Sequence, residues 1–305
     1  MALGYDKQLY ILAFDHRGSF EKMFGVSGRA PTDEESQKII DAKNLIWEGF
    51  QRAVDEGAPR EAAGVLVDAQ YGDAVARAAR DGGYVFAMPV EKSGQNEFDF
   101  EYGDDFGAKI EEYDPTFSKV LVRYNPAGDQ EMNRRQSERL RRLSDWLHEH
   151  DRKFLFELLV PAEPQQLEAV GGDEDRYDQE VRPGLMIRAI VELQDFGVEP
   201  DIWKIEGVDD REDCRTIAET CRRDGRDGVT CVVLGRGASD AKVDEWLRAG
   251  AGVPGYVGFA IGRSIFGESV KALAAGEGDR DELSDKVARN YLRFIDVYQS
   301  ASVPA

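Results

Sequence analysis

Short apolar runs alternate with longer amphipathic stretches along most of this chain of 305 residues. The runs predict eight strands, which span Leu9 to Phe14, Gly64 to Val67, Tyr84 to Met88, Lys119 to Arg123, Phe154 to Leu159, Ile202 to Ile205, Thr230 to Leu234 and Gly258 to Ile261. Between them, stretches such as Glu34 to Asp55 carry apolar residues at helical spacing. Repeated strand–helix units predict a parallel sheet covered by helices. Eight such units favour an α/β fold of the closed (β/α)8 or TIM barrel type over an open doubly wound sheet.

The order of the predicted elements also bears on domain organisation. An open dinucleotide-binding sheet needs a Gly-x-Gly-x-x-Gly turn after its first strand, and the residues at that place do not supply it. No linker, repeat or low-complexity tract divides the chain, so we expect a single domain over residues 1–305. Within it, residues 9–267 form the predicted barrel core, and residues 268–305 form a C-terminal helical closure with a frayed end.

Charge and hydropathy exclude several classes of partner. The chain has 39 basic and 59 acidic residues, a formal net charge of −20, which argues against nucleic acid or an anionic membrane as partner. No apolar run approaches the roughly 20 residues needed to span a membrane. The N-terminus lacks the basic and apolar regions of a secretory signal, so we expect a cytoplasmic protein. The sequence leaves open whether the chain forms a homo-oligomer.

Cysteine and histidine are scarce. The three cysteines form no Cys-x-x-Cys pair, so we expect reduced structural thiols rather than disulfides or a zinc site. They are Cys214, Cys221 and Cys231. The three histidines are His16, His148 and His150. Since His148 and His150 fall at a polar helix end, little is left for a histidine-based metal site, and no metal is expected.

Charged residues follow or end the first six predicted strands. In a TIM barrel these strand ends surround the active site. The residues are Asp15, Asp68, Glu91, Lys92, Lys119, Arg123, Glu157 and Lys204. Side chains alternate between the two faces of a strand, and one choice of face turns Asp15, Asp68, Glu157 and Lys204 inward. Buried charges are costly unless they pair, so a carboxylate–lysine cluster is predicted, although each member alone also fits a structural ion pair or a cap.

Lys204 lies in the apolar segment Pro200 to Gly207. Apolar surroundings lower the pKa of a lysine and leave a neutral amine. Such an amine attacks a carbonyl and forms a Schiff base. For Lys204 alone, a structural pair with a barrel carboxylate is an equal alternative; the neighbouring charged strand ends favour covalent catalysis.

Glycine-containing loops follow the last two predicted strands. They are Leu234 to Ser239, with Gly235, Arg236 and Gly237, and Ile261 to Phe266, with Gly262 and Arg263. Glycine lets backbone N–H groups approach an anion, and the loops after strands 7 and 8 are the recurrent phosphate site of this fold. Arginine adds a bidentate donor. Each loop alone also fits a simple turn.

Several of these segments together resemble a known family, the Schiff-base tagatose 1,6-bisphosphate aldolases. Within it, the chain is most similar to the aldolase-type domain fused to the sugar kinase of myo-inositol catabolism. The motifs are Tyr10 to Phe20, Leu66 to Gly72, Glu91 to Gly94, Lys119 to Pro126, Phe156 to Leu158, Trp203 to Glu206 and Gly258 to Arg263. Two places depart from the family pattern, at Gly235 to Gly237 and at Asp68 to Tyr71, and they bear on the second phosphate of a tagatose substrate.

The resemblance implies roles for individual residues. Lys204 would form the Schiff base, Glu157 would act as acid and base, Lys119 would be a second active-site lysine, and Asp15 would orient a substrate hydroxyl. The predicted substrate- and phosphate-binding residues are Arg17, Asp68, Lys92, Arg123, Gly235, Arg236, Gly237, Gly262 and Arg263. No cofactor beyond the covalent Schiff base is expected.

The expected activity is metal-independent cleavage of a phosphorylated ketose or keto-acid to dihydroxyacetone phosphate and an aldehyde. The favoured substrate is 5-dehydro-2-deoxygluconate 6-phosphate. Tagatose 1,6-bisphosphate or a sulfofructose phosphate are alternatives, and so is a non-catalytic barrel that binds a sugar phosphate. A metal-dependent aldolase or isomerase would lack its usual histidine ligands.

Overall fold

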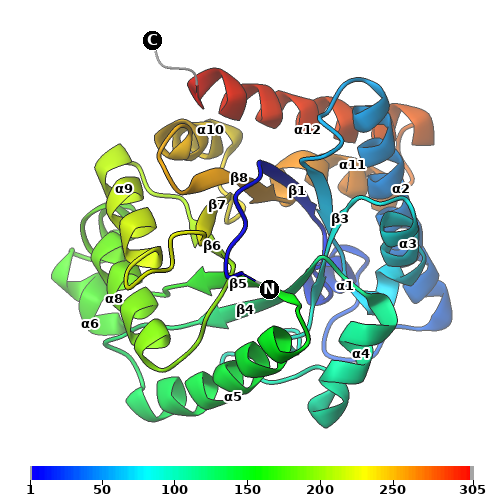
Figure 1. Cartoon of the computed structure of the whole chain (residues 1–305). Coiled ribbons are helices and arrows are strands. Elements are labelled where there is room, and N and C mark those ends of the chain that lie inside the picture. Colours follow the sequence, from blue (N-terminus) through cyan, green and yellow to red (C-terminus); the bar gives the residue numbers. More distant parts are fainter. Residues whose placement is uncertain (1, 303–305) are drawn as a thin grey trace.

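The computed structural model describes residues 2–302, which form one closed parallel barrel surrounded by helices (Figure 1). The strands are β1 (Leu9–Ala13), β2 (Ala63–Leu66), β3 (Val85–Pro89), β4 (Phe117–Arg123), β5 (Lys153–Leu159), β6 (Ile202–Glu206), β7 (Thr230–Leu234) and β8 (Tyr256–Ile261). Each strand pairs with the next in sequence, and β8 closes the ring on β1. The predicted TIM barrel is confirmed, with all eight predicted strands overlapping those of the structure.

The helices lie outside the ring. They are α1 (Gly18–Met23), α2 (Asp33–Asp55), α3 (Ala69–Asp81), α4 (Phe106–Tyr113), α5 (Gln130–Glu149), α6 (Pro164–Ala169), α7 (Glu174–Arg176), α8 (Arg182–Asp195), α9 (Arg211–Cys221), α10 (Asp240–Gly250), α11 (Arg263–Ala275) and α12 (Arg280–Ser302). A 3-10 turn, η1 (Gly103–Asp105), precedes α4, and a π-helical turn, η2 (Tyr177–Val181), precedes α8. Side-chain caps define several helix starts: at α2, Thr32 and Glu35 form a reciprocal capping box.

Two apolar clusters form the core. A small cluster fills the barrel interior and includes Ala13, Leu155 and Ile202, which alternate with the outward-facing strand residues. A much larger cluster lies between the strands and the helices. Because Ala13, Leu155 and Ile202 face inward, the residues two positions further along the chain lie on the axis side of the barrel mouth.

The C-terminal helix α12 closes the barrel beside α2 (Figure 1). Tyr291 donates a hydrogen bond to the carbonyl oxygen of Tyr10 at 2.6 Å, so α12 is tied to β1. On the surface, Arg52 of α2 forms ion pairs with Asp281 and Asp285. Helix α12 thus extends to residue 302 against β1 and α2, while residues 303–305 of the predicted closure lie outside the described part.

All three cysteines are buried and free, as predicted. Within residues 2–302, no helix combines the length and apolar character that crossing a membrane requires.

Candidate active site

A cavity of about 420 Å³ opens at the C-terminal ends of the barrel strands. Of the thirteen predicted site residues, twelve line it. They are Asp15, Arg17, Lys92, Lys119, Arg123, Glu157, Lys204, Gly235, Arg236, Gly237, Gly262 and Arg263. The structure thus brings together residues from β1, β3–β8 and the segments that follow them.

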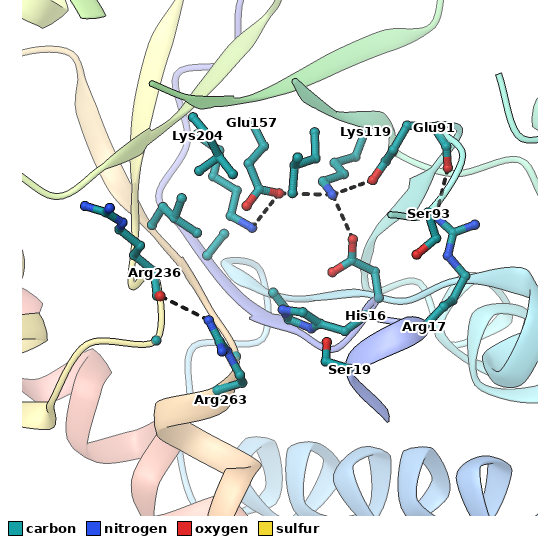
Figure 2. Close-up of a pocket in the computed structure, with 18 of the residues that line it drawn as sticks. His16, Arg17, Ser19, Glu91, Ser93, Lys119, Glu157, Lys204, Arg236 and Arg263 are labelled. Carbon is teal, nitrogen blue, oxygen red and sulfur yellow. Dashed lines mark hydrogen bonds and ion pairs between the residues drawn. The ribbon is translucent and has the colours of Figure 1, made fainter. Parts of the chain in front are cut away.

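Lys119 is the centre of a buried charge cluster (Figure 2). Its Nζ lies 2.8 Å from Asp15, 2.7 Å from Glu91 and 3.0 Å from Glu157. The Glu157 Oε2 atom that meets Lys119 also lies 3.0 Å from the Nζ of Lys204. One carboxylate oxygen therefore connects the two lysines.

Electrostatics assign different protonation states within this cluster. Burial lowers the pKa of Lys119, but Asp15, Glu157 and Glu91 outweigh burial and hold the pKa well above its usual value. Burial raises the pKa of Glu157, yet Lys119 and Lys204 bring it below the usual value. Burial dominates at Glu91, and the pKa of that carboxyl is raised. Lys119 therefore stays an ammonium, and Glu157 is the carboxylate shared between the two amines.

Strand register explains the contact between Lys204 and Glu157. The two residues are direct partners in the parallel pairing of β6 with β5. Lys204 is 3% exposed, and Glu157 accompanies its amine at the axis of the barrel. The apolar segment around Lys204 thus surrounds an amine that has an acidic partner, as the predicted carboxylate–lysine cluster requires, because the inward positions at this level of the barrel are charged.

The loops after β7 and β8 meet at one side of the cavity. Arg263 is the first residue of α11, and its Nη2 donates to the carbonyl oxygen of Arg236 at 3.0 Å. Gly237 has a φ of +76°, and a Cβ there would lie 2.3 Å from that Nη2. A Cβ on Gly262 would lie 2.1 Å from the carbonyl oxygen of Ala13. Glycine is thus required at both positions, and the N-terminus of α11 stays open to the cavity.

Two of the four arginines predicted to bind substrate or phosphate form ion pairs within the protein. Arg236 binds Asp178 at 2.6 Å and Glu206 at 3.2 Å. Arg17 binds Glu101 at 3.0 Å and the carbonyl oxygen of Glu91 at 2.8 Å. Their guanidinium groups hold the segments around the cavity in place.

Arg123 and Lys92 lie on the other side of the cavity from the glycine loops. Arg123 donates to the carbonyl oxygen of Gln95 at 2.9 Å and lines the cavity. Lys92 is exposed. Together they give this end of the cavity positive charge.

Asp68 was predicted to bind substrate, but it does not line the cavity. The chain leaves β2 at Leu66, and Asp68 becomes the N-cap of α3, accepting a hydrogen bond from the backbone of Tyr71 at 2.8 Å. Its other oxygen pairs with Lys43 of α2, and both side chains are fully buried. Strand alternation does not extend through a residue that caps a helix, so the inward orientation predicted for Asp68 was wrong.

Sequence reasoning missed two residues of this site. Glu91 follows β3 and was noted only as a charged strand end, whereas it contacts Lys119 directly. His16 follows Asp15 and lines the cavity, with the edge of its ring toward Phe266. His16 lies in the same sequence motif as Asp15, which could have pointed to it. Being next to Asp15 in sequence does not show, however, that its side chain also faces the cavity.

Among residues 2–302, no group of three or more His, Cys, Asp or Glu side chains has an arrangement able to hold a metal ion.

Residues 4–302 match a protein family described as "Uncharacterized protein conserved in bacteria (DUF2090)". The chain belongs to this family. Among solved structures, the DUF2090 chain is similar to Cgl0159 from Corynebacterium glutamicum, with a TM-score of 0.58 and 17% identity over 96% of this chain and 88% of the other. It is also similar to a Schiff-base-forming fructose-1,6-bisphosphate aldolase, with a TM-score of 0.53 and 13% identity over 94% and 93% of the two chains. A search of curated proteins gives no match. At these identities the similarity establishes the shared barrel fold.

Proposed function

We propose that this DUF2090 protein is a Schiff-base aldolase that needs no metal. The observation that carries the proposal is the position of Lys204, whose buried amine lies on the cavity side of β6, 3.0 Å from Glu157. The barrel shared with a Schiff-base-forming aldolase supports it. An amine beside a carboxylate supplies both the nucleophile and the proton carrier that imine formation needs.

The proposed reaction begins with attack of the Lys204 amine on the substrate ketone. Glu157 passes the proton released by the attacking amine to the former ketone oxygen, which becomes the carbinolamine hydroxyl. A second proton, taken up from solvent and delivered by Glu157, lets that hydroxyl leave as water and gives a protonated imine. That iminium accepts the electrons of the breaking C–C bond. Acid–base catalysis of this kind contributes roughly 10²- to 10⁴-fold in rate. Lys119 remains protonated and neutralises the surrounding carboxylates.

The two ends of the cavity support a substrate with two anionic ends. At one end, Gly237, the N-terminus of α11 and Arg263 suit a phosphate, because backbone N–H groups and the helix dipole favour an anion there. At the other end, Arg123 and Lys92 suit a second anion. We assign the first end to the phosphate of the dihydroxyacetone phosphate half and the second to the anionic group of the aldehyde half.

The favoured substrate is 5-dehydro-2-deoxygluconate 6-phosphate, which carries a phosphate and a carboxylate at opposite ends. Cleavage gives dihydroxyacetone phosphate and malonate semialdehyde. Tagatose 1,6-bisphosphate and sulfofructose phosphate also have two anionic ends and are the competing candidates. The sequence resemblance to the aldolase-type domain of myo-inositol catabolism is the ground for the order of preference.

A substrate panel tests the proposal. Each candidate is incubated with the protein, and release of dihydroxyacetone phosphate is measured with and without a chelator. We expect cleavage of at least one candidate, unchanged by the chelator and abolished in Lys204→Met. Lys271→Met, at an exposed position of α11, is the matched control and should retain full activity. Turnover by Lys204→Met, or loss of activity with the chelator, would contradict the proposal.

A further inference from the structure

His16 differs from the acidic residues that line the same cavity. Its ring is partly open to the cavity, while its Nδ1 is buried and has no hydrogen-bond partner. In the view of Figure 2 the ring lies between Arg263 on one side and Arg17 on the other. His16 therefore lines the same cavity as Arg263 and Arg123, which we assign to the two anionic ends of the substrate.

The carboxylates of the cavity already have partners. Asp15 and Glu91 each bind Lys119, and Glu157 binds both Lys119 and Lys204. Burial raises the pKa values of Asp15 and Glu157, but Lys119 and Lys204 outweigh burial and hold both below their usual range, so these two carboxylates are poor proton acceptors. Burial raises the pKa of Glu91, which stays paired with Lys119. Among the acids and imidazoles that line the described cavity, His16 is the base without an ion-pair partner.

The surroundings of His16 keep it neutral, and the nearby carboxylate of Asp15 offsets part of the cost of a positive charge on the ring. Burial lowers the pKa of His16 to about 4, so the imidazole is neutral near pH 7. The carboxylate of Asp15 acts in the opposite direction and stabilises positive charge on the ring. A neutral imidazole beside a carboxylate can accept a proton and keep the resulting charge paired.

We propose that His16 is the catalytic base for C–C cleavage, a role that rests on the Schiff-base function proposed above. Its imidazole takes the proton from the hydroxyl group on the carbon that becomes the aldehyde. The O–H electron pair forms the new C=O bond, the C–C bond breaks, and its electrons enter the iminium on Lys204 to give an enamine. The imidazolium then releases its proton to water in the cavity. Glu157 serves the separate proton transfers of imine formation and hydrolysis.

Two reactions of dihydroxyacetone phosphate distinguish C–C cleavage from imine and enamine formation. Borohydride trapping of the imine on Lys204 and exchange of the C–H proton in D₂O both involve the imine but no C–C cleavage. In His16→Gln we expect trapping and exchange within about threefold of wild type, and cleavage of the phosphorylated substrate lowered by roughly 10²-fold or more. His148→Gln, an exposed histidine near the end of α5, is the control and should change none of the three.

Other results would overturn the assignment. Cleavage by a folded His16→Gln within about fivefold of wild type would remove His16 from the chemistry. An equal fall in trapping and cleavage would make it a structural or binding residue. If His16→Gln melts early, His16→Ala with added imidazole replaces it: restored cleavage supports a base, and unchanged cleavage contradicts one. Absence of any imine adduct in the wild type would instead refute the Schiff-base function itself.

Discussion

We predict that the buried pair between Lys43 and Asp68 stabilises the fold and takes no part in substrate binding. Lys43 of α2 is 0% exposed and Asp68 is 1% exposed. The Lys43 amine also donates to the carbonyl oxygens of Phe14 and His16. Lys43→Met keeps most of the volume but leaves a buried carboxylate and two carbonyl oxygens without their donor. Removing one partner of a buried pair costs about 3–5 kcal/mol.

That loss converts into a measurable shift of the melting temperature. Unfolding entropy of about 2.1 cal/mol/K per residue gives roughly 0.6 kcal/mol/K for a chain of 305 residues. A loss of about 4 kcal/mol therefore lowers Tm by roughly 6 °C, which calorimetry or a circular-dichroism melt resolves. Well below Tm, the KM for the cleaved substrate should stay within about twofold of wild type, since neither residue lines the cavity.

A matched variant on the same helix provides the control. Lys38 is exposed and pairs with Glu34 one turn away, a contact that solvent screens, so Lys38→Met should shift Tm by less than about 1 °C. Asp68→Asn should retain the cap on α3 and lose only the ion pair. Two outcomes would refute the reasoning: a Tm change in Lys43→Met as small as in Lys38→Met, or a KM effect in Asp68→Asn without a stability effect.

Three further predictions concern the cavity. Lys119→Met removes an ammonium partner from three carboxylates, of which Glu157 keeps Lys204, and raises their pKa values in the folded state, so we expect its stability to fall as pH rises from 5 to 8, as measured by urea unfolding. Arg263→Ala should raise the KM of a phosphorylated substrate roughly 10- to 100-fold in steady-state kinetics, the effect of losing one charged hydrogen bond; an unchanged KM would place the phosphate elsewhere. The folded pKa of His16 lies below its unfolded value, so its contribution, up to about 3 kcal/mol, is present above pH 6.5 and lost as pH falls toward 4; His16→Gln should flatten that part of the stability profile, and an unaltered profile would show that His16 stays protonated or exposed.

The fold was predictable because the barrel strands are buried on both faces. Such strands are nearly continuous apolar runs, and eight of them in regular alternation with helices leave few topologies. The connections between strands and helices were harder to predict from the sequence. The polar stretch from Gly171 to Glu180 carries no apolar residues at helical spacing, yet it holds α7 and part of η2. There, Tyr177 donates to the carbonyl oxygen of Val160, and Asp178 pairs with Arg182. These tertiary contacts have no local sequence signal.

Extending strand alternation predicted the inward positions of Glu157, Lys204 and Asp15, the last of which lies two residues beyond Ala13, but failed at Asp68. It placed Glu157 and Lys204 on the inward face correctly, since both lie within strands. Asp68 lies beyond its strand, and its partner Lys43 is on a helix 25 residues earlier, a contact that periodicity cannot reveal. For His16, the free Nδ1 depends on how the ring packs beside Phe266, which also requires the folded structure.

The central claim is that Lys204 forms the imine. The most direct test treats the protein with dihydroxyacetone phosphate and borohydride, then locates the adduct by peptide mass analysis. We predict a single reduced adduct on the peptide that contains Lys204, absent in Lys204→Met and present in the Lys271→Met control. No adduct in the wild type, or an adduct on Lys119 instead, would contradict the account.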